Sequence, residues 1–417
     1  MTLTYEHTKI GCKLNFFLDA VNCTFIGLLY TTLQTQFNLD ITQLAFFSTV
    51  SWAVMAVLIP AASLLTGKIG FRTASIITQL ANILALFGMA VLPYVMNPYI
   101  ALVLVNGLIG FGNGMIEATN NAIFESLPLK NKDAEMNKLH STFSFGQVIV
   151  ILLSTVFFVT FGTEQWKYLA IAYGCVAIVN LFIFSKAPFG PIVEETERTP
   201  LGSILKSKIF IILVIVLICN GPIEMCMTNW TSLFAEQGLH VSKTVGDLLG
   251  PCLYAAGMGL SRLFYGFKGT EINLEKAMKI CGFISAASYF VVVFAPWPLV
   301  SLIACGVVGL STGILCPGCT CILSKTFPKG GVSMFGLLIM FQFFGNALTS
   351  NMIGNVVTSV QNSVPAICLK MFPVTDPYEL GLRTALFFVA CMALVMAIFI
   401  MLAERYIKSH NISQENR

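Results

Sequence analysis

The chain is a succession of long apolar runs, each about as long as a helix that crosses a lipid bilayer, separated by short polar breaks. A membrane-spanning helix needs about 20 predominantly apolar residues, and twelve such runs can be drawn in the 417 residues. The runs are unbroken, whereas strands of a membrane β-barrel alternate. Because 56% of the residues are apolar and only 11% are charged, a soluble or disordered chain is excluded. The sequence predicts an all-α polytopic membrane protein.

The predicted spans form two sets of six. The first set lies at 13–36, 42–66, 73–93, 98–125, 139–162 and 167–185, and the second at 209–236, 244–266, 277–295, 298–322, 332–358 and 381–403. The longest polar stretch separates the two sets. We therefore expect an N-terminal six-helix bundle at 1–186, a linker at 187–208 and a C-terminal six-helix bundle at 209–417. No small-residue cleavage pattern follows the first run, so we expect that run to remain as an uncleaved helix.

The basic residues are unevenly distributed between the predicted loops. With a cytoplasmic N-terminus, twenty of the 24 Lys and Arg residues fall in cytoplasmic segments, and the exceptions are Lys167, Lys243, Lys370 and Arg383. Lys and Arg are enriched on the cytoplasmic side of membrane proteins. The bias predicts a multi-pass protein of the cell membrane with both termini and the linker in the cytoplasm. We expect it to act as a monomer in the lipid bilayer without a nucleic-acid partner.

Two glycine-rich stretches suggest that the two halves are related. The stretches are Gly107-Leu-Ile-Gly110-Phe-Gly-Asn-Gly114 in the fourth span and Gly306-Val-Val-Gly309-Leu-Ser-Thr-Gly313 in the tenth, 199 residues apart. One such stretch alone indicates close packing of two helices through small residues. The shared spacing predicts that each half is a copy of one six-helix unit in the same orientation.

The segment after the second span resembles the loop signature of the major facilitator superfamily. That signature has a glycine, an acidic residue, a basic residue, another glycine and further basic residues. The chain has Lys68, Gly70 and Arg72, with Gly67 where the acid is expected, and a second copy around Arg262. The resemblance implies the major facilitator fold of two pseudo-symmetric bundles with 12 transmembrane helices, and a cytoplasmic conformational gate at Lys68, Gly70, Arg72 and Arg262.

Polar residues share one helical face in four of the spans. They are Asn15, Asp19 and Asn22 in the first span, Asn106, Asn113, Glu117 and Asn120 in the fourth, Asn220, Glu224, Thr228 and Thr231 in the seventh, and Gln342, Asn346 and Thr349 in the eleventh. A single buried Asn fits an interhelical hydrogen bond equally well, but four polar stripes facing lipid would be costly. We therefore expect a polar central cavity. Its amides suit a hydroxyl-rich ligand, because an amide both donates and accepts hydrogen bonds.

A closer resemblance begins at Glu117. The stretch Glu117-Ala-Thr-Asn120-Asn121-Ala122 is similar to the acid-to-Asn motif of the fucose–proton symporter family, with Ala122 in place of the usual proline. Asp19 and Glu117 correspond to the two membrane acids of that family, and the resemblance implies roles for them in proton transfer and sugar binding. Glu224, Trp230 and Pro317 also fit the family pattern.

These patterns give a set of candidate residues. The histidines fall at predicted span ends or in loops, so proton coupling is expected to use the carboxylates of Glu117, Asp19 and Glu224. The expected solute-binding residues are Asn22, Asn113, Asn120, Asn121, Gln147, Asn220, Trp230, Gln342 and Asn346, where Gln147 comes from the predicted counterpart of the eleventh span. No metal or cofactor is expected, because the cysteine cluster at 316–321 has no second ligand pair.

The preferred interpretation is a secondary active transporter, not an enzyme, that couples proton entry to uptake of a sugar or similar polyhydroxylated solute by alternating access. No nucleotide-binding loop is present in the sequence, which disfavours ATP as the energy source. A proton-driven exporter of amphipathic drugs or metabolites is the main alternative, because the 34 Phe residues and Met-rich helices allow it. A receptor on the same fold is a further alternative. The solute, the coupling ion and the direction of transport stay open.

Overall fold

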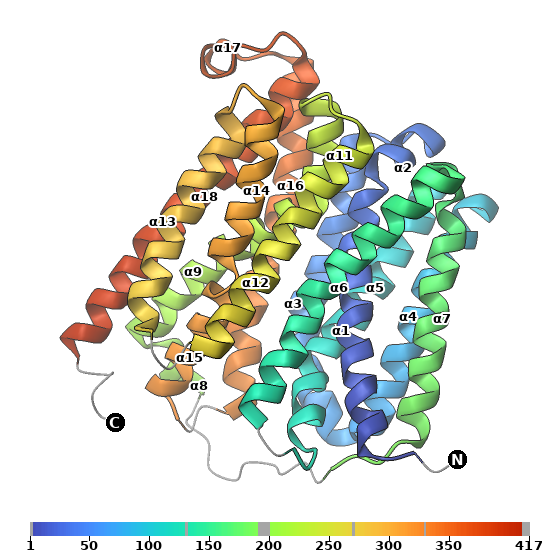
Figure 1. Cartoon of the computed structure of the whole chain (residues 1–417), viewed down its shortest axis with the longest axis vertical. Coiled ribbons are helices and arrows are strands. Elements are labelled where there is room, and N and C mark those ends of the chain that lie inside the picture. Colours follow the sequence, from blue (N-terminus) through green and yellow to red (C-terminus); the bar gives the residue numbers. More distant parts are fainter. Residues whose placement is uncertain (1–2, 130–131, 191–200, 269–271, 329–330, 411–417) are drawn as a thin grey trace. The chain divides into compact units, whose positions relative to one another are not determined.

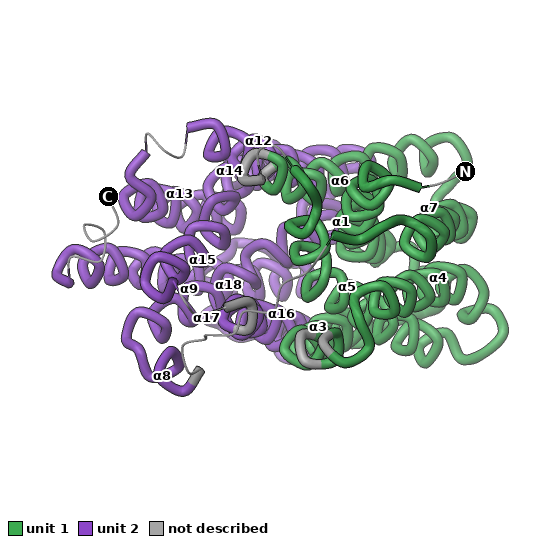
Figure 2. Tube along the Cα trace, turned by 90° about the horizontal axis from the view of Figure 1, so that it is seen from below, with its two compact units in different colours: residues 1–193 green, residues 194–417 purple. Residues whose placement is uncertain are grey.

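The structure is a computed structural model that describes residues 3–129, 132–190, 201–268, 272–328 and 331–410. The described chain consists of helices and their connections, without a strand. It divides into two compact units, Met1–Val193 and Glu194–Arg417, which Figure 2 colours separately. The division falls inside the segment expected as a linker, 187–208. The middle of that segment lies outside the described residues.

Unit 1 is a bundle of membrane-length helices (Figure 1). Its elements are α1 (Tyr5–Leu28), α2 (Tyr30–Phe37), α3 (Ile41–Ile69), α4 (Phe71–Val95), α5 (Pro98–Glu125), α6 (Lys132–Phe161), the short 3₁₀ turn η1 (Thr163–Gln165) and α7 (Trp166–Lys186). Helix α5 packs against α3 and α4, and α1 packs against α5, α6 and α7. Helix α1 therefore lies against helices that carry their own polar residues, among them α5 with Asn113, Glu117 and Asn120.

Unit 2 is built from a similar set of helices, with three π-helical turns in its first half. Its elements are α8 (Leu201–Leu205), α9 (Lys208–Met225), the π turn η2 (Cys226–Trp230), α10 (Thr231–Leu233), the π turn η3 (Phe234–Gly238), α11 (Lys243–Asp247), the π turn η4 (Leu248–Cys252), α12 (Leu253–Lys268), α13 (Leu274–Phe294), α14 (Pro298–Thr312), α15 (Leu315–Thr326), α16 (Gly331–Asn362), α17 (Ala366–Met371) and α18 (Pro377–Ser409). Helix α9 packs against α16 and α18, and α12 and α13 pack against α14.

The number of membrane-length helices differs from the twelve expected. In the described chain, ten helical segments are long and apolar enough to cross a membrane, and α1 and α2, which meet at a bend of 53°, make an eleventh if taken together. The expected span at 244–266 is not among them, although α11, η4 and α12 form a continuous helical run there. Lys243, Asp247 and Arg262 make that run more polar than the others. The predicted class, an all-α polytopic membrane protein, is confirmed.

Several helices begin at residues that satisfy the unpaired N–H groups of a helix start. The side chains of Asp40, Asn97 and Asn273 each accept a hydrogen bond from the backbone N–H three residues further on, at 2.8, 3.2 and 2.8 Å. Such caps typically stabilise a helix by about 1 kcal/mol. Pro98 and Pro298 occupy the first positions of α5 and α14, where proline costs no hydrogen bond. The two halves therefore start corresponding helices in the same way.

The glycine repeat corresponds to one packing contact that occurs in both units. In unit 1, a Cβ atom on Gly110 of α5 would overlap the carbonyl oxygen of Ser51 in α3. In unit 2, a Cβ atom on Gly309 of α14 would overlap the carbonyl oxygen of Tyr254 in α12. Only a residue without a side chain lets the two backbones approach this closely.

We expect Gly110→Ala to destabilise the protein by roughly 1–3 kcal/mol, the usual cost of forcing extra volume into a packed interior. The measurement is the thermal unfolding midpoint of the purified protein in detergent. Gly107→Ala on the same helix is the matched control, because a Cβ there would meet nothing closer than 3.9 Å. Equal loss of stability in both variants would contradict the backbone contact as the cause.

Ionic contacts join the first turns of α1 and α6. Lys9 of α1 lies 2.5 Å from Glu135 of α6, and Lys138 lies 2.9 Å from the same carboxylate. The hydrogen bonds from Lys9 and then Lys138 lower the pKa of Glu135 to about 2. Glu135 is therefore ionised at physiological pH, and it ties together the ends of two helices on which candidate residues lie.

Candidate functional site

A cluster of buried amides surrounds Asn15 in unit 1. The Nδ2 atom of Asn15 in α1 donates to Oδ1 of Asn120 in α5 at 3.1 Å. Its Oδ1 atom accepts from Gln79 of α4 at 2.7 Å and from Asn180 of α7 at 2.8 Å. All four side chains are buried. Away from water, amides must find partners within the protein, and here they join four helices.

A second amide cluster lies further along α1. The Nδ2 atom of Asn22 donates to Oδ1 of Asn82 in α4 at 2.8 Å and to Oδ1 of Asn113 in α5 at 2.7 Å. The Nδ2 atom of Asn113 in turn donates to the Sγ atom of Cys23 at 3.4 Å. This cluster again connects α1 with α4 and α5.

The two clusters determine how α1 and α5 are aligned. Paired residues are seven positions apart on each helix, or roughly 10 Å along the axis. Numbers rise along α1 as they fall along α5, so the two helices are antiparallel. The candidate acids occupy the level between the two amide pairs. We call the three levels the α1–α5 ladder: Asn15 with Asn120, Asp19 with Glu117, and Asn22 with Asn113.

The middle level of the ladder places two carboxylates together. Asp19 is 2% exposed and Glu117 is half-buried, and the two interact electrostatically. The thiol of Cys23, one turn along α1, donates to Oδ1 of Asp19 at 3.7 Å. Two carboxylates that share a water-poor site resist carrying two negative charges at once. The pair is therefore chemically suited to holding one proton and releasing it.

In unit 2, the candidate acid Glu224 has amide neighbours. The Nδ2 atom of Asn220 donates to Oε1 of Glu224 at 2.9 Å, and the Nε2 atom of Gln342 in α16 lies 3.5 Å from Oε2. Arg262 and Tyr254 of α12 also interact with Glu224 electrostatically. A cation, Arg262, therefore acts on the carboxylate of Glu224.

The neighbourhood of Glu224 results from a close crossing of α9 and α16. Pro222 has no N–H, so the carbonyl of Ile218 lacks its helical donor, and Gly345 of α16 packs directly against that carbonyl. Asn346 packs against Gly221, and with its nitrogen turned toward α9 it lies 2.9 Å from the Gly221 carbonyl oxygen. Asn346 thus contributes to the helix crossing in this structure.

Several of the expected solute-binding amides retain an oxygen atom that accepts no hydrogen bond. Within the described residues, these oxygens belong to Asn22, Asn121, Gln147, Asn220 and Gln342. Gln147 does donate to Thr24 at 3.2 Å. A buried acceptor without a donor is costly, so a hydroxyl group would be favourable at each of them. Trp230 lies in the π turn η2 and is 1% exposed.

The candidate gate residues lie at the ends of helices. Lys68 is exposed in the last turn of α3. Gly70 joins α3 to α4 with φ of +79°, a conformation that favours glycine. Arg72 donates to the carbonyl oxygens of Phe184, Ser185 and Ala187 at 2.8–2.9 Å, and thereby caps the end of α7. Arg262 is half-buried, with its Nε atom 3.4 Å from the carbonyl oxygen of Gly313. Their role as a gate remains a prediction.

Sequence reasoning missed four residues that contact the candidate site. Gln79, Asn82 and Asn180 are buried partners in the amide clusters. Each is an amide inside an apolar run, which is costly in lipid without a partner, so the signal was present in the sequence. Cys23 is four residues after Asp19, a spacing that places both on one helical face.

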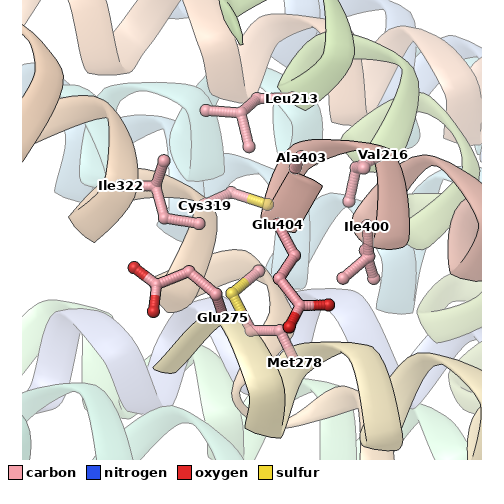
Figure 3. Close-up of a pocket in the computed structure, with 9 residues that line it drawn as sticks. All are labelled: Leu213, Val216, Glu275, Met278, Cys319, Ile322, Ile400, Ala403 and Glu404. Carbon is pink, nitrogen blue, oxygen red and sulfur yellow. The ribbon is translucent and has the colours of Figure 1, made fainter. Parts of the chain in front are cut away.

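A small hollow in unit 2, without room for a water molecule, does not belong to the candidate site (Figure 3). It lies between α9, α13, α15 and α18, with mostly apolar walls. Two carboxylates, Glu275 and Glu404, line it. Glu404 is already paired with Lys279 at 2.6 Å and Lys408 at 2.7 Å. The lining residue Val216 precedes Glu224 by eight positions on α9, or about 12 Å. Among the described residues, no three His, Cys, Asp or Glu side chains are grouped as a metal site.

Repeated bundles of membrane-length helices with carboxylates and amides inside them are typical of a membrane transport protein. The chain belongs to the Major Facilitator Superfamily, whose family model matches residues 14–350. The predicted resemblance to this superfamily is confirmed.

The individual relatives share only 13–23% sequence identity with the chain. The chain is 23% identical over 326 residues to the multi-drug resistance efflux pump PmrA of Streptococcus pneumoniae, covering 76% of this chain and 80% of the pump. A D-xylose–proton symporter structure aligns with a TM-score of 0.77 at 14% identity, over 95% of this chain and 97% of the symporter. A bacterial homologue of the human lysosomal transporter Spinster gives 0.74 at 13% identity, over 96% and 97%. The Escherichia coli fucose:proton symporter gives 0.65 at 14% identity, over 95% and 98%. These likenesses establish the fold.

Proposed function

We propose that the protein is a proton-coupled secondary transporter that takes up a sugar or similar polyhydroxylated solute by alternating access. The observation that carries the proposal is the middle level of the α1–α5 ladder, where buried Asp19 interacts electrostatically with half-buried Glu117. A proton carrier inside a membrane must accept and release a proton. A pair of interacting carboxylates meets that requirement, because the negative charge of one opposes ionisation of the other.

The unsatisfied amide oxygens support a hydroxyl-rich solute. Asn121, Gln147, Asn220 and Gln342 each have an acceptor without a donor among the described residues, and sugar hydroxyls are donors. The amides of Gln79 and Asn180 also have such an oxygen, but they belong to the cluster around Asn15 that holds helices together. Asn22 also has such an oxygen, but its Nδ2 atom joins α1 to α4 and α5. We therefore assign solute contact to the four residues Asn121, Gln147, Asn220 and Gln342. We assign a packing role to Asn120 and Asn346, which have interhelical partners.

The energetics of proton coupling fit this task. A membrane potential of 100 mV is worth about 2.3 kcal/mol per charge. One proton carried with a neutral solute therefore sustains roughly a fiftyfold accumulation, at about 1.4 kcal/mol per tenfold.

The distribution of basic residues further supports a cell-membrane location with both termini in the cytoplasm.

A second candidate function is proton-driven export of amphipathic compounds. The relative at 23% identity is named as a multidrug efflux pump. The interhelical partners of Asn120 and Asn346 also leave fewer amides for a solute rich in hydroxyls than the sequence suggested. Both functions would use the same acid pair, so they differ in solute and direction.

The distinguishing experiment is a thermal-shift screen of the purified protein against neutral sugars, organic acids and amphipathic cations. A ligand at a hundred times its Kd stabilises the folded state by about 2.7 kcal/mol. We expect a neutral sugar or polyol to raise the unfolding midpoint and to accumulate in proteoliposomes when protons flow inward. Stabilisation by amphipathic cations alone, with transport opposite to the proton flow, would favour the exporter.

A further inference from the structure

We propose that Cys23 and Asn113 are positioning residues that hold the Asp19 carboxylate in place for proton exchange, and that Asn113 acts on Asp19 through the Cys23 thiol. The inference rests on the proposed function, in which Asp19 and Glu117 carry the proton. It changes the role of Asn113, which the sequence suggested as a solute ligand.

The contacts form a directed chain. The Nδ2 atom of Asn113 donates to Sγ of Cys23 at 3.4 Å, and the Cys23 thiol donates to Oδ1 of Asp19 at 3.7 Å. One thiol performs both functions, because its sulfur accepts on one side while its hydrogen points to the other. The Oδ1 atom of Asn113 is also occupied, since Asn22 donates to it at 2.7 Å. Asn113 is therefore fixed at both ends of its amide.

This chain connects the acid pair to the interhelical amide cluster. Asn22 donates to both Asn113 and Asn82, so the position of the Cys23 thiol depends on the contact between α1, α4 and α5. A thiol donor stabilises the ionised form of a carboxylate more than the protonated form. The position of the thiol thus affects the pH at which Asp19 releases its proton.

Other titratable groups near this part of α1 are few in the described residues. Glu117 of α5 acts on both Asp19 and Cys23. From α6, the ring of His140 lies tilted against that of Phe16, with ring centroids 5.2 Å apart. From α7, Tyr173 lies edge-on to Phe25 at 5.4 Å. Neither ring is among the groups that act on Asp19, so the thiol and Glu117 are its titratable neighbours.

The test is the pH profile of solute transport in proteoliposomes. Cys23→Ala removes the donor to Asp19, so we expect the midpoint of the profile to rise by about half a pH unit, while solute Kd stays unchanged. Cys23→Ser restores a donor and should return the midpoint toward the wild-type value. Cys12→Ala is the matched control, because this thiol is equally part of α1 but packs among apolar side chains such as Phe16 and Ile116.

A double-mutant comparison tests whether Asn113 acts through the thiol. Asn113→Ala alone should shift the midpoint in the same direction as Cys23→Ala, and in the Cys23→Ala background it should add nothing further. Additive shifts, or a weaker solute Kd in Asn113→Ala, would overturn the positioning role. Where Asn113→Ala yields no folded protein, the Cys23 series decides by itself.

The proposal and the function on which it rests fail in different ways. A wild-type midpoint in Cys23→Ala, together with a changed profile in Glu117→Gln, would overturn the positioning role alone. A wild-type profile in both Glu117→Gln and Asp19→Asn would instead remove the acid pair as the proton carrier.

Discussion

Glu117→Gln is expected to abolish proton-driven accumulation of the solute while leaving solute binding and exchange intact. Gln reproduces the shape and hydrogen-bonding capacity of a protonated Glu but never releases a proton. With one acid of the middle ladder level permanently neutral, Asp19 loses the negative neighbour that acts on it and with which we propose that it shares a proton. The pH dependence of solute binding should disappear in the same variant.

Proteoliposomes separate the two activities. Counterflow of labelled solute at equal pH reports exchange, and accumulation under an inward proton gradient reports coupling. Glu125→Gln is the matched control, because Glu125 is at the end of the same helix and is exposed. Accumulation by Glu117→Gln at the wild-type level would show that the coupling acid lies elsewhere, and Glu224 would become the candidate.

Asn15→Leu is expected to cause the largest loss of stability among the substitutions considered. The change keeps the approximate size of the side chain and removes every hydrogen bond that Asn15 makes. Asn120, Gln79 and Asn180 would each lose a partner inside the bundle. Since an unsatisfied buried polar group costs about 1–3 kcal/mol, we expect a total of roughly 3–6 kcal/mol.

The measurement is the thermal unfolding midpoint together with the yield of monodisperse protein after size-exclusion chromatography. Asn106→Leu serves as the control. Asn106 is also buried, and among the described residues its amide nitrogen donates to the carbonyl of Leu102 on its own helix, at 2.8 Å, and not to another helix. Equal stability of Asn15→Leu and wild type would show that the cluster around Asn15 does not hold unit 1 together.

The sequence by itself determined the class of protein and the course of its helices. In lipid, every backbone N–H and C=O must be hydrogen-bonded within the protein. A run of apolar residues of membrane length therefore forms a helix, which pairs these groups within the run itself. Most of the predicted spans lie within one helix or a short run of helical segments in the structure. The close packing of two helices in each half could also be predicted from the glycine repeat. Helices whose backbones are in direct contact need glycine at the contact, as at Gly110 and Gly309.

The tertiary structure decided which polar side chains meet. Helical periodicity shows that Asn15, Asp19 and Asn22 share a face of α1, but it contains no information about which helix that face contacts. A polar face fits both a neighbouring helix and a solute, since an amide makes the same hydrogen bonds with either. Only the packing of α1 against α4, α5 and α7 pairs Asn15 and Asn22 with amides of other helices and sets Asp19 beside Glu117. That pairing depends on the antiparallel alignment of helices about 100 residues apart in the sequence, and side-chain spacing within one helix does not determine it.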